Sequence, residues 1–190
     1  MNPIPSLSRT LALTAPAVAL TLASAHAASD YLLEIEGIKG ESKDSKHRDA
    51  IEIESFSWGC SNSGSAAKVI NLVLSKPLDK ASPQLFLACA KGNHIPQAIL
   101  TLRKTNASGG KTDYYQVTLT DILVSSYQNS AGDSQSGGGG GAGGTAVSAP
   151  ADRLSFYPIK LKVSYTRLDE TGEPMEEPVV AEYDFSGAPQ

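Results

Sequence analysis

The stretch LSFYPIKLKVSYTRL, residues 154–168, has the most regular alternation in the chain. Apolar side chains occupy every second position in its second half, at Ile159, Leu161, Val163 and Tyr165. Because neighbouring side chains of an extended strand point to opposite faces, this spacing predicts a β-strand with one buried face.

Six further segments have the same strand character. They are rich in β-branched and aromatic residues. These segments are residues 31–38, 50–60, 68–75, 98–104, 113–126 and 179–185. Seven strands in a chain of this length predict a mainly β fold, either a sandwich or a barrel.

The segment AIEIESFSWGC, residues 50–60, changes phase along its length. Ile51 and Ile53 alternate on one face, whereas Phe56 and Trp58 continue the alternation one position out of step. A shift of one residue would turn every later side chain to the other face unless an extra residue is accommodated. We therefore expect a β-bulge that bends this strand.

One helix is predicted between the strands. Ser82 is a favourable N-cap, Pro83 suits the first helical position, and Gly92 follows the last periodic residue. The stripe expected to pack against the sheet consists of Leu85, Ala88 and Cys89. The pattern indicates packing rather than binding as the role of this helix.

Residues 1–27 resemble a secretory signal peptide. Arg9 precedes the apolar run 11–23, and Ala25 and Ala27 fit a small-x-small site with cleavage after Ala27. The alternatives are a misassigned start codon or a retained anchor. Cleavage would leave residues 28–190 as one domain, secreted or periplasmic, with no membrane segment.

Charge and cysteine content limit the partners and the redox chemistry. The chain has 16 basic and 20 acidic residues, a net charge of −4, which does not suit nucleic-acid binding. Cys60 and Cys89 form either a disulfide, as an oxidising compartment permits, or two free thiols, with Cys89 acting as a small apolar residue.

Two segments have the composition of loops. Residues 127–150 contain a run of glycine and serine that cannot bury enough surface to offset its ordering entropy, so a flexible loop is predicted. The acidic, proline-containing segment 169–178 is expected to join the last two strands.

The sequence offers no arrangement suited to catalysis. His47 and His94 lack ligand-spaced partners, so no metal site is predicted, and His47 is expected to be solvated. The glycines of 137–144 are not followed by the lysine of a phosphate-binding loop. SWGCSNSG, residues 57–64, lacks the spacing of a nucleophile elbow. We expect no enzyme activity, no catalytic residues and no cofactor.

Five blocks, taken in order, are similar to the haemolysin-coregulated protein (Hcp) family of type VI secretion systems. They are GIKGESKD (37–44), SFSWGCSNSGS (55–65), KPLDKASPQLFLACAKGNHIPQAILTLRK (76–104), LTDILVSSYQNS (119–130) and FYPIKLKVSYT (156–166). The helix block is the most specific of these. The resemblance implies a compact antiparallel β-barrel of two sheets with one flanking α-helix.

The resemblance also implies self-assembly. Members of the family form hexameric rings that stack into a tube, which carries or exports effectors. A signal peptide is unusual in such proteins, which assemble in the cytoplasm and leave through the machine. The alternative is therefore a periplasmic or secreted binding or adhesive module that builds no tube.

The loop 39–49 is the expected subunit-contact loop, because the resemblance implies that it reaches towards neighbouring subunits. The alternative is a loop that is merely solvated. Mixed charge suits a contact that sets register. Its charged residues are Lys39, Glu41, Lys43, Asp44, Lys46, Arg48 and Asp49. A second expected contact combines exposed strand edges with the ladder Ile159, Leu161 and Val163, and Lys160 and Lys162 face water or the channel.

Overall fold

The computed structural model describes residues 30–62, 64, 67–130 and 150–186. These residues form eight strands and one helix, and all the strand pairs are antiparallel. The elements are β1 (Asp30–Ile35), β2 (Ile51–Ile53), β3 (Ser55–Asn62), β4 (Ala67–Pro77), α1 (Ser82–Lys91), β5 (His94–Thr105), β6 (Lys111–Ser130), β7 (Ala151–Tyr165) and β8 (Val179–Asp184).

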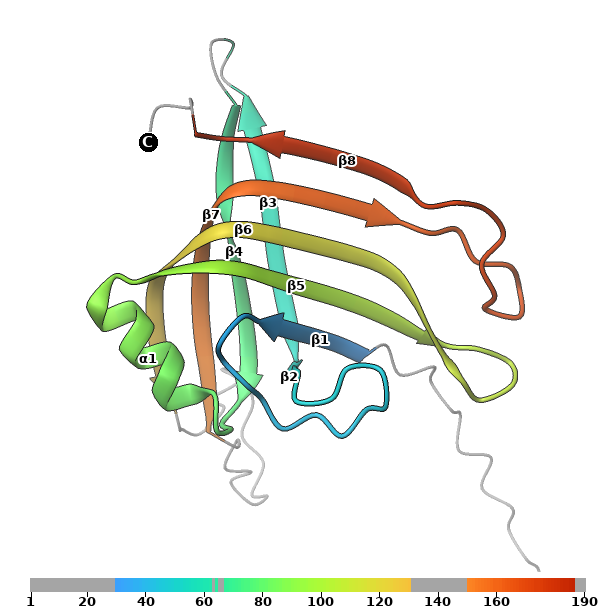
Figure 1. Ribbon diagram of the computed structural model, residues 1–190, viewed down its shortest axis with the longest axis horizontal. Coiled ribbons are helices and arrows are strands. Elements are labelled where there is room, and N and C mark those ends of the chain that lie inside the picture. Colours follow the sequence, from blue (N-terminus) through green and yellow to red (C-terminus); the bar gives the residue numbers. More distant parts are fainter. Residues whose placement is uncertain (1–29, 63, 65–66, 131–149, 187–190) are drawn as a thin grey trace, which may run out of the picture.

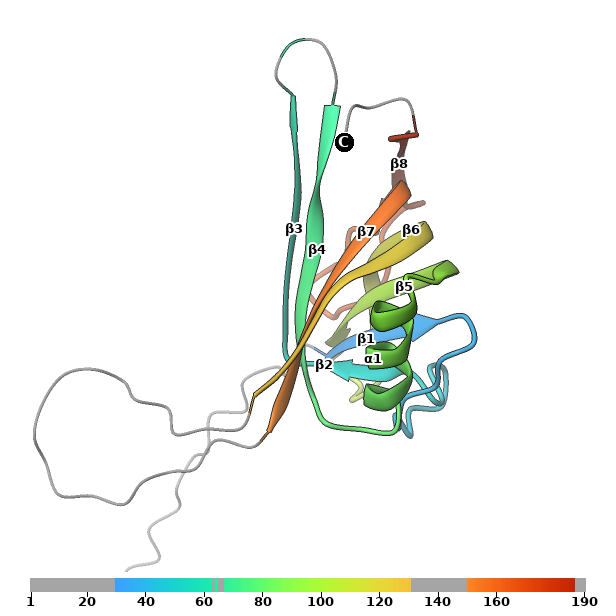
Figure 2. The same cartoon turned by 90° about the vertical axis from the view of Figure 1, so that its left-hand side faces the viewer.

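The strands join into one continuous sheet that curls on itself. Its order is β2-β1-β5-β6-β7-β4-β3, and β8 pairs with β7 beside this path. The two ends of the path, β2 and β3, are separated in the chain by Glu54 alone. A sheet whose end strands are consecutive in sequence must bend round until those ends meet, which gives the barrel-like shape seen in Figure 2.

The sheet has two halves, and the long strands β6 and β7 run through both of them (Figure 1). Strand β7 pairs with β4 through residues 151–156 and with β8 through residues 160–165. Strand β6 bends where its register shifts between Val124 and Ser126. Strands that change sheets at such irregularities form the corners of orthogonal β packings. The expected antiparallel β fold with one flanking helix is confirmed, and its two sheets are halves of one continuous sheet.

The predicted irregularity in residues 50–60 is present. The segment is interrupted at Glu54 and its pairing with β4 shifts between Ser57 and Gly59. This break allows β2 to pair with β1 while β3 pairs with β4. The phase change in the sequence therefore marks the place where the chain passes from one end of the sheet to the other.

The core lies between the halves of the sheet and under α1. Its fully buried side chains include Leu33, Leu100, Leu119 and Phe156. Each such side chain contributes on the order of 1.5–3 kcal/mol when it leaves water. Along the strands, polar side chains on the outer face alternate with apolar side chains that face the core, as expected for antiparallel strands with one solvated face.

Helix α1 covers one opening of the curled sheet with Leu85 and Ala88, which are buried. Gly92 ends the helix in the left-handed conformation with φ 62°, as the sequence predicted. The expected Ser82 N-cap is wrong. Ala81 occupies the cap position, and Ser82 is the first helical residue.

The Ser82 side chain is diverted because it joins a buried polar cluster. Lys76 Nζ lies 3.1 Å from Asp152 Oδ2 and donates to Ser82 Oγ at 2.9 Å. The other carboxylate oxygen of Asp152 accepts from Tyr127 and Asn129. A buried ion pair is stable only when its remaining hydrogen-bonding groups are satisfied, as here. The cluster fixes the start of α1 to β4, β6 and β7.

Three sequence expectations concern segments at the boundaries of the described residues. Strand β6 continues to Ser130, so the predicted flexible loop 127–150 begins too early. The rest of that loop, residues 131–149, and the predicted signal peptide 1–27 lie outside the described residues. Residues 169–178 connect β7 to β8, as predicted.

Candidate subunit-contact surfaces

The charged loop 39–49 lies between β1 and β2 and packs against its own barrel. Gly40 donates its N–H to the carbonyl of Asp49 at 2.7 Å, and Ser42 donates to Ala50 at 3.0 Å. A Cβ on Gly40 would lie 2.4 Å from the Ala50 carbonyl oxygen. This close approach requires glycine at residue 40.

Arg103 of β5 holds the middle of the loop. Its side chain is 3% exposed, with Nη1 2.6 Å from Asp44 Oδ2 and Nε 2.6 Å from Asp113 Oδ1. Burial favours the neutral form of Asp44. This effect is outweighed by contact with Arg103 and hydrogen bonds from the backbone N–H groups of Lys46 and His47, which lower the pKa of Asp44 to about 2. The ionised carboxylate therefore ties the loop to the sheet.

His47 takes part in the same attachment, and the expectation that it is solvated is wrong. The residue is 7% exposed. Its Nδ1 lies 3.1 Å from Glu34 Oε2 and its Nε2 lies 3.2 Å from Asp113 Oδ2. Ionised carboxylates only accept hydrogen bonds, so both nitrogens can donate only when the ring is an imidazolium. A loop sequence gives no sign of such partners, because Asp113 is 66 residues away.

The outer side of the loop carries the remaining charges. Asp49 pairs with Lys39 at 3.3 Å and with Lys80 at 3.4 Å, and Glu41 accepts the backbone N–H of Lys80. In the part of the chain that the structure describes, three exposed cations of the loop have no ion-pair partner: Lys43, Lys46 and Arg48. The seven charged residues thus divide into internally bonded groups and an outward-facing basic set.

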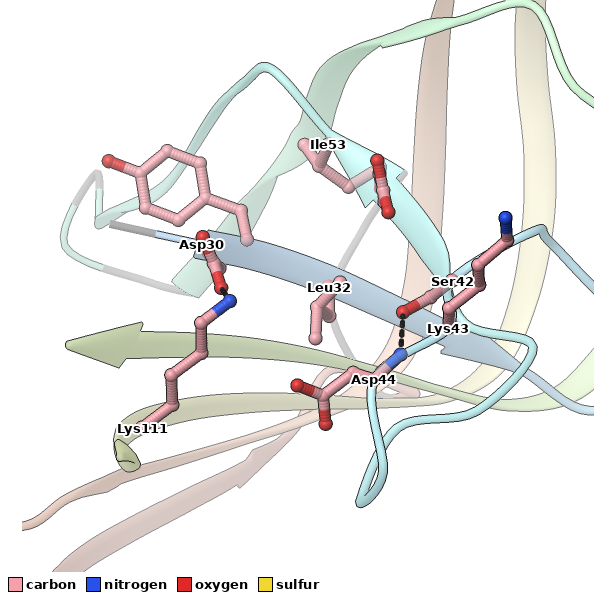
Figure 3. A pocket seen from close by; sticks show the side chains of 9 residues that line it. Asp30, Leu32, Ser42, Lys43, Asp44, Ile53 and Lys111 are labelled. Atoms are coloured by element: carbon pink, nitrogen blue, oxygen red, sulfur yellow. Dashed lines mark hydrogen bonds and ion pairs between the residues drawn. The ribbon is translucent and has the colours of Figure 1, made fainter. Parts of the chain in front are cut away.

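A polar pocket of about 330 Å³ lies between this loop and strands β1 and β2 (Figure 3). Asp30 is paired with Lys111 on one side, and Ser42 Oγ accepts the N–H of Asp44 on the other. Of the charged residues that line it, Asp30 pairs with Lys111 and Asp44 pairs with Arg103, whereas Lys43 and Glu52 make no ion pair among the described residues.

An apolar groove of about 350 Å³ opens between β3 and the β7–β8 pair. Its walls are made largely by Trp58, Leu161, Val163, Tyr183 and Phe185. The rings of Tyr183 and Phe185 are in contact, with centroids 4.7 Å apart. Because apolar surface exposed to water costs free energy, such a concave patch is typical of an interaction site.

Strand β8 borders this groove and forms an edge of the sheet. All six of its residues are exposed, and it pairs with β7 on one side. Val179 is 70% exposed and Val180 is 51% exposed. An edge strand with apolar side chains presents unpaired N–H and C=O groups that can template another strand. Two of the three expected ladder residues, Leu161 and Val163, line the groove beside this edge.

The remaining candidate residues, the two cysteines and His94, lie on three different elements. Cys60 is an exposed free thiol on β3 and Cys89 is a partly buried free thiol on α1, and the possible Cys60–Cys89 disulfide remains a prediction. His94 Nδ1 lies 2.6 Å from Asp121. Among the described residues, no group of three metal-ligating side chains occurs, and no helix is long and apolar enough to cross a membrane.

Comparison with known proteins shows the family to which this architecture belongs. The family model described as "Type VI secretion system effector, Hcp" matches residues 32–165. Protein hcp1 of Pseudomonas aeruginosa is 38% identical over 109 residues, which cover 52% of this chain and 67% of that protein.

Solved structures of Hcp proteins resemble this chain in both sequence and fold. The crystal structure of Hcp1 from Salmonella typhimurium has 34% identity and a TM-score of 0.65, covering 84% of this chain and 96% of that chain. Hcp2 from the same organism has 32% identity and a TM-score of 0.59, covering 82% of this chain and 95% of that chain.

The described residues therefore define a barrel-like β domain of the type found in secretion-system proteins. This chain belongs to the Hcp family of type VI secretion systems.

Proposed function

We propose that this protein is a structural subunit that assembles with copies of itself into hexameric rings. These rings stack into a tube that carries effector proteins or is exported with them by a type VI machine. Membership of the Hcp family supports this role. No residue of the proposed mechanism is catalytic, since the protein acts through its surfaces.

The observation that carries the proposal is the fully exposed edge strand β8 beside the apolar groove. Both features leave bonding capacity unused in the monomer, namely backbone hydrogen bonds along the edge and apolar area in the groove. A contact between two different faces of identical chains repeats head to tail, and it closes into a ring when the rotation allows.

The charged loop 39–49 is proposed to fix the relative position of neighbouring subunits in these contacts. Within the loop, Asp44 is bonded to Arg103, and His47 is bonded to Glu34 and Asp113, so the loop is held in place before a neighbour arrives. The outward cations Lys43, Lys46 and Arg48 are then available to a neighbouring subunit. Charged rims set orientation and exclude wrong partners more than they increase affinity.

Light scattering coupled to size exclusion, followed by electron microscopy, tests the proposal on the full chain. Rings of six subunits are expected at micromolar concentration. A strictly monomeric protein would contradict ring formation. If discrete rings form but never stack, the proposed tube is contradicted and the proposed ring is retained.

The alternative function is that of a periplasmic or secreted binding module with the same fold. The signal-like pattern of residues 1–27 favours this alternative and an exported location. Cell fractionation with N-terminal sequencing distinguishes the two. An N-terminus at Ala28 in the periplasm supports the exported form, and an intact Met1 in the cytoplasm supports assembly there.

A further inference from the structure

His47 connects the loop 39–49 to two strands of the sheet at once. The residue is buried, and a carboxylate from a different strand faces each nitrogen of its ring. Glu34 of β1 lies 3.1 Å from Nδ1, and Asp113 of β6 lies 3.2 Å from Nε2. The backbone N–H of His47 donates to Asp44 within the loop. One side chain therefore bonds the loop to both β1 and β6.

The charges around this ring are balanced only when the ring is charged. The charged side chains bonded to it, or to its carboxylates, are Glu34 of β1, Asp113 of β6 and Arg103 of β5, and Asp44 of the loop shares Arg103. Arg103 already contacts Asp44 and Asp113, each at 2.6 Å. With a charged ring, three carboxylates meet two cations, whereas with a neutral ring they meet Arg103 alone.

A neutral ring cannot keep both of its bonds. Neutral imidazole has a proton on one nitrogen and a lone pair on the other, and an ionised carboxylate only accepts hydrogen bonds. The unprotonated nitrogen would therefore face an oxygen of Glu34 or Asp113 with no hydrogen between them. Burial opposes ionisation of Asp44, but its contacts with Arg103 and with backbone N–H groups lower its pKa to about 2. Asp44 thus stays ionised between about pH 5 and 8, the range in which histidine changes charge.

We propose that His47 is a proton-dependent latch for the loop 39–49. When the ring is charged, the loop is docked on β1 and β6, and when the ring loses its proton, the loop detaches from one of these strands. Because the docked loop requires the proton and the detached loop does not, docking is favoured at low pH and is lost as the pH rises. This latch is a property of one subunit, so it goes beyond the proposed assembly and does not rest on it.

Two substitutions with opposite expected outcomes test the latch. In His47→Gln, an amide with one donating and one accepting group replaces the ring, as in neutral histidine, so the loop should be loose at every pH. In Glu34→Gln, Nδ1 gains a partner that can either accept or donate, so even a neutral ring keeps both bonds and the loop should stay docked. The control is His94→Gln, because His94 is the other histidine of the described residues and lies exposed beside Asp121.

Hydrogen exchange of the full chain, followed by mass spectrometry from about pH 5.5 to about pH 9, measures docking across the range in which histidine titrates. Exchange is corrected for its intrinsic dependence on pH. The reporters are the backbone N–H groups of Gly40, Ser42 and Asp49, which are bonded between the two arms of the loop. In the original protein and in His94→Gln, their protection should fall about tenfold or more as the pH rises, as expected for the loss of a hydrogen bond between charged groups. Protection should be low throughout in His47→Gln and high throughout in Glu34→Gln.

Protection that does not change with pH in the original protein overturns the latch. So does protection that falls with pH in Glu34→Gln as it does in the original protein, and this comparison holds even if His47→Gln fails to fold by circular dichroism. The outcome is separate from the proposed function. A monomeric protein with a pH-dependent loop would contradict the rings and keep the latch, whereas rings with a pH-independent loop would keep the rings and contradict the latch.

Discussion

The loop 39–49 and the apolar groove differ in how much of their bonding capacity the monomer already uses. The loop has the highest charge density in the chain, yet Asp44 and His47 are bound by side chains of its own sheet. The groove carries little charge, but Trp58 and Tyr183 leave apolar surface open. A contact surface is therefore indicated by groups left unsatisfied after folding, and not by charge density in the sequence. The expected contact role of the loop remains a prediction that rests on its outer cations.

The largest expected effect comes from the charge that fixes the loop. Replacing Arg103 with Met leaves the carboxylates of Asp44 and Asp113 without their buried cation. Removing one partner of a buried ion pair typically costs about 3–5 kcal/mol. Urea unfolding should show this loss in the free energy of unfolding. Arg48→Met, an exposed arginine of the same loop, is the control, and equal stabilities of the two variants would contradict the anchoring role.

A smaller effect is expected from the protonation of Asp44. Its folded-state pKa of about 2 lies below its ordinary value of 3.8. The stabilisation is therefore complete above about pH 4 and is lost as the pH falls towards 2. It amounts to about 1 kcal/mol once solvent screening is allowed for. Urea unfolding across this range should give a steeper acid loss for the original protein than for Asp44→Asn, and parallel curves would argue against it.

The outer ion pair of the loop should matter much less. Lys39 is 74% exposed in its pair with Asp49, so water and salt screen the attraction. We expect Lys39→Met to leave the thermal unfolding midpoint within experimental error. A clear decrease would mean that the outer charges also hold the loop, which would weaken the distinction from the inner charges.

The smallest change is expected from salt acting on assembly. Raising ionic strength from about 0.1 M to about 1 M shortens the screening length to about 3 Å and weakens exposed charge contacts. Assembly through the groove should persist or increase, because burial of apolar surface does not depend on charge. Sedimentation velocity at both salt concentrations measures this. Dissociation in high salt would instead indicate that the charged loop 39–49, and not the groove, makes the main contact between subunits.

Local sequence patterns determined the elements of this protein. Period-2 alternation located the strands, the phase change in residues 50–60 indicated an irregularity there, and Gly92 marked the helix end. The split of that segment into two strands at Glu54 was not predicted. These signals could be interpreted because they depend on neighbouring residues and on backbone geometry that repeats every two or every 3.6 residues. The resemblance of five blocks in order, of which residues 76–104 are the most specific, indicated the family.

Only the tertiary structure decided which side chains are satisfied. Lys76 meets Asp152 across 76 positions of the chain, and Ser82 leaves its expected cap role to join them. A buried lysine or arginine implies a partner, but neither its identity nor its distance follows from local pattern. The groove likewise exists because β3 and the β7–β8 pair diverge when the sheet curls. The physical reason is that periodicity fixes the direction of each side chain within its element, whereas its neighbours are chosen by how the elements pack.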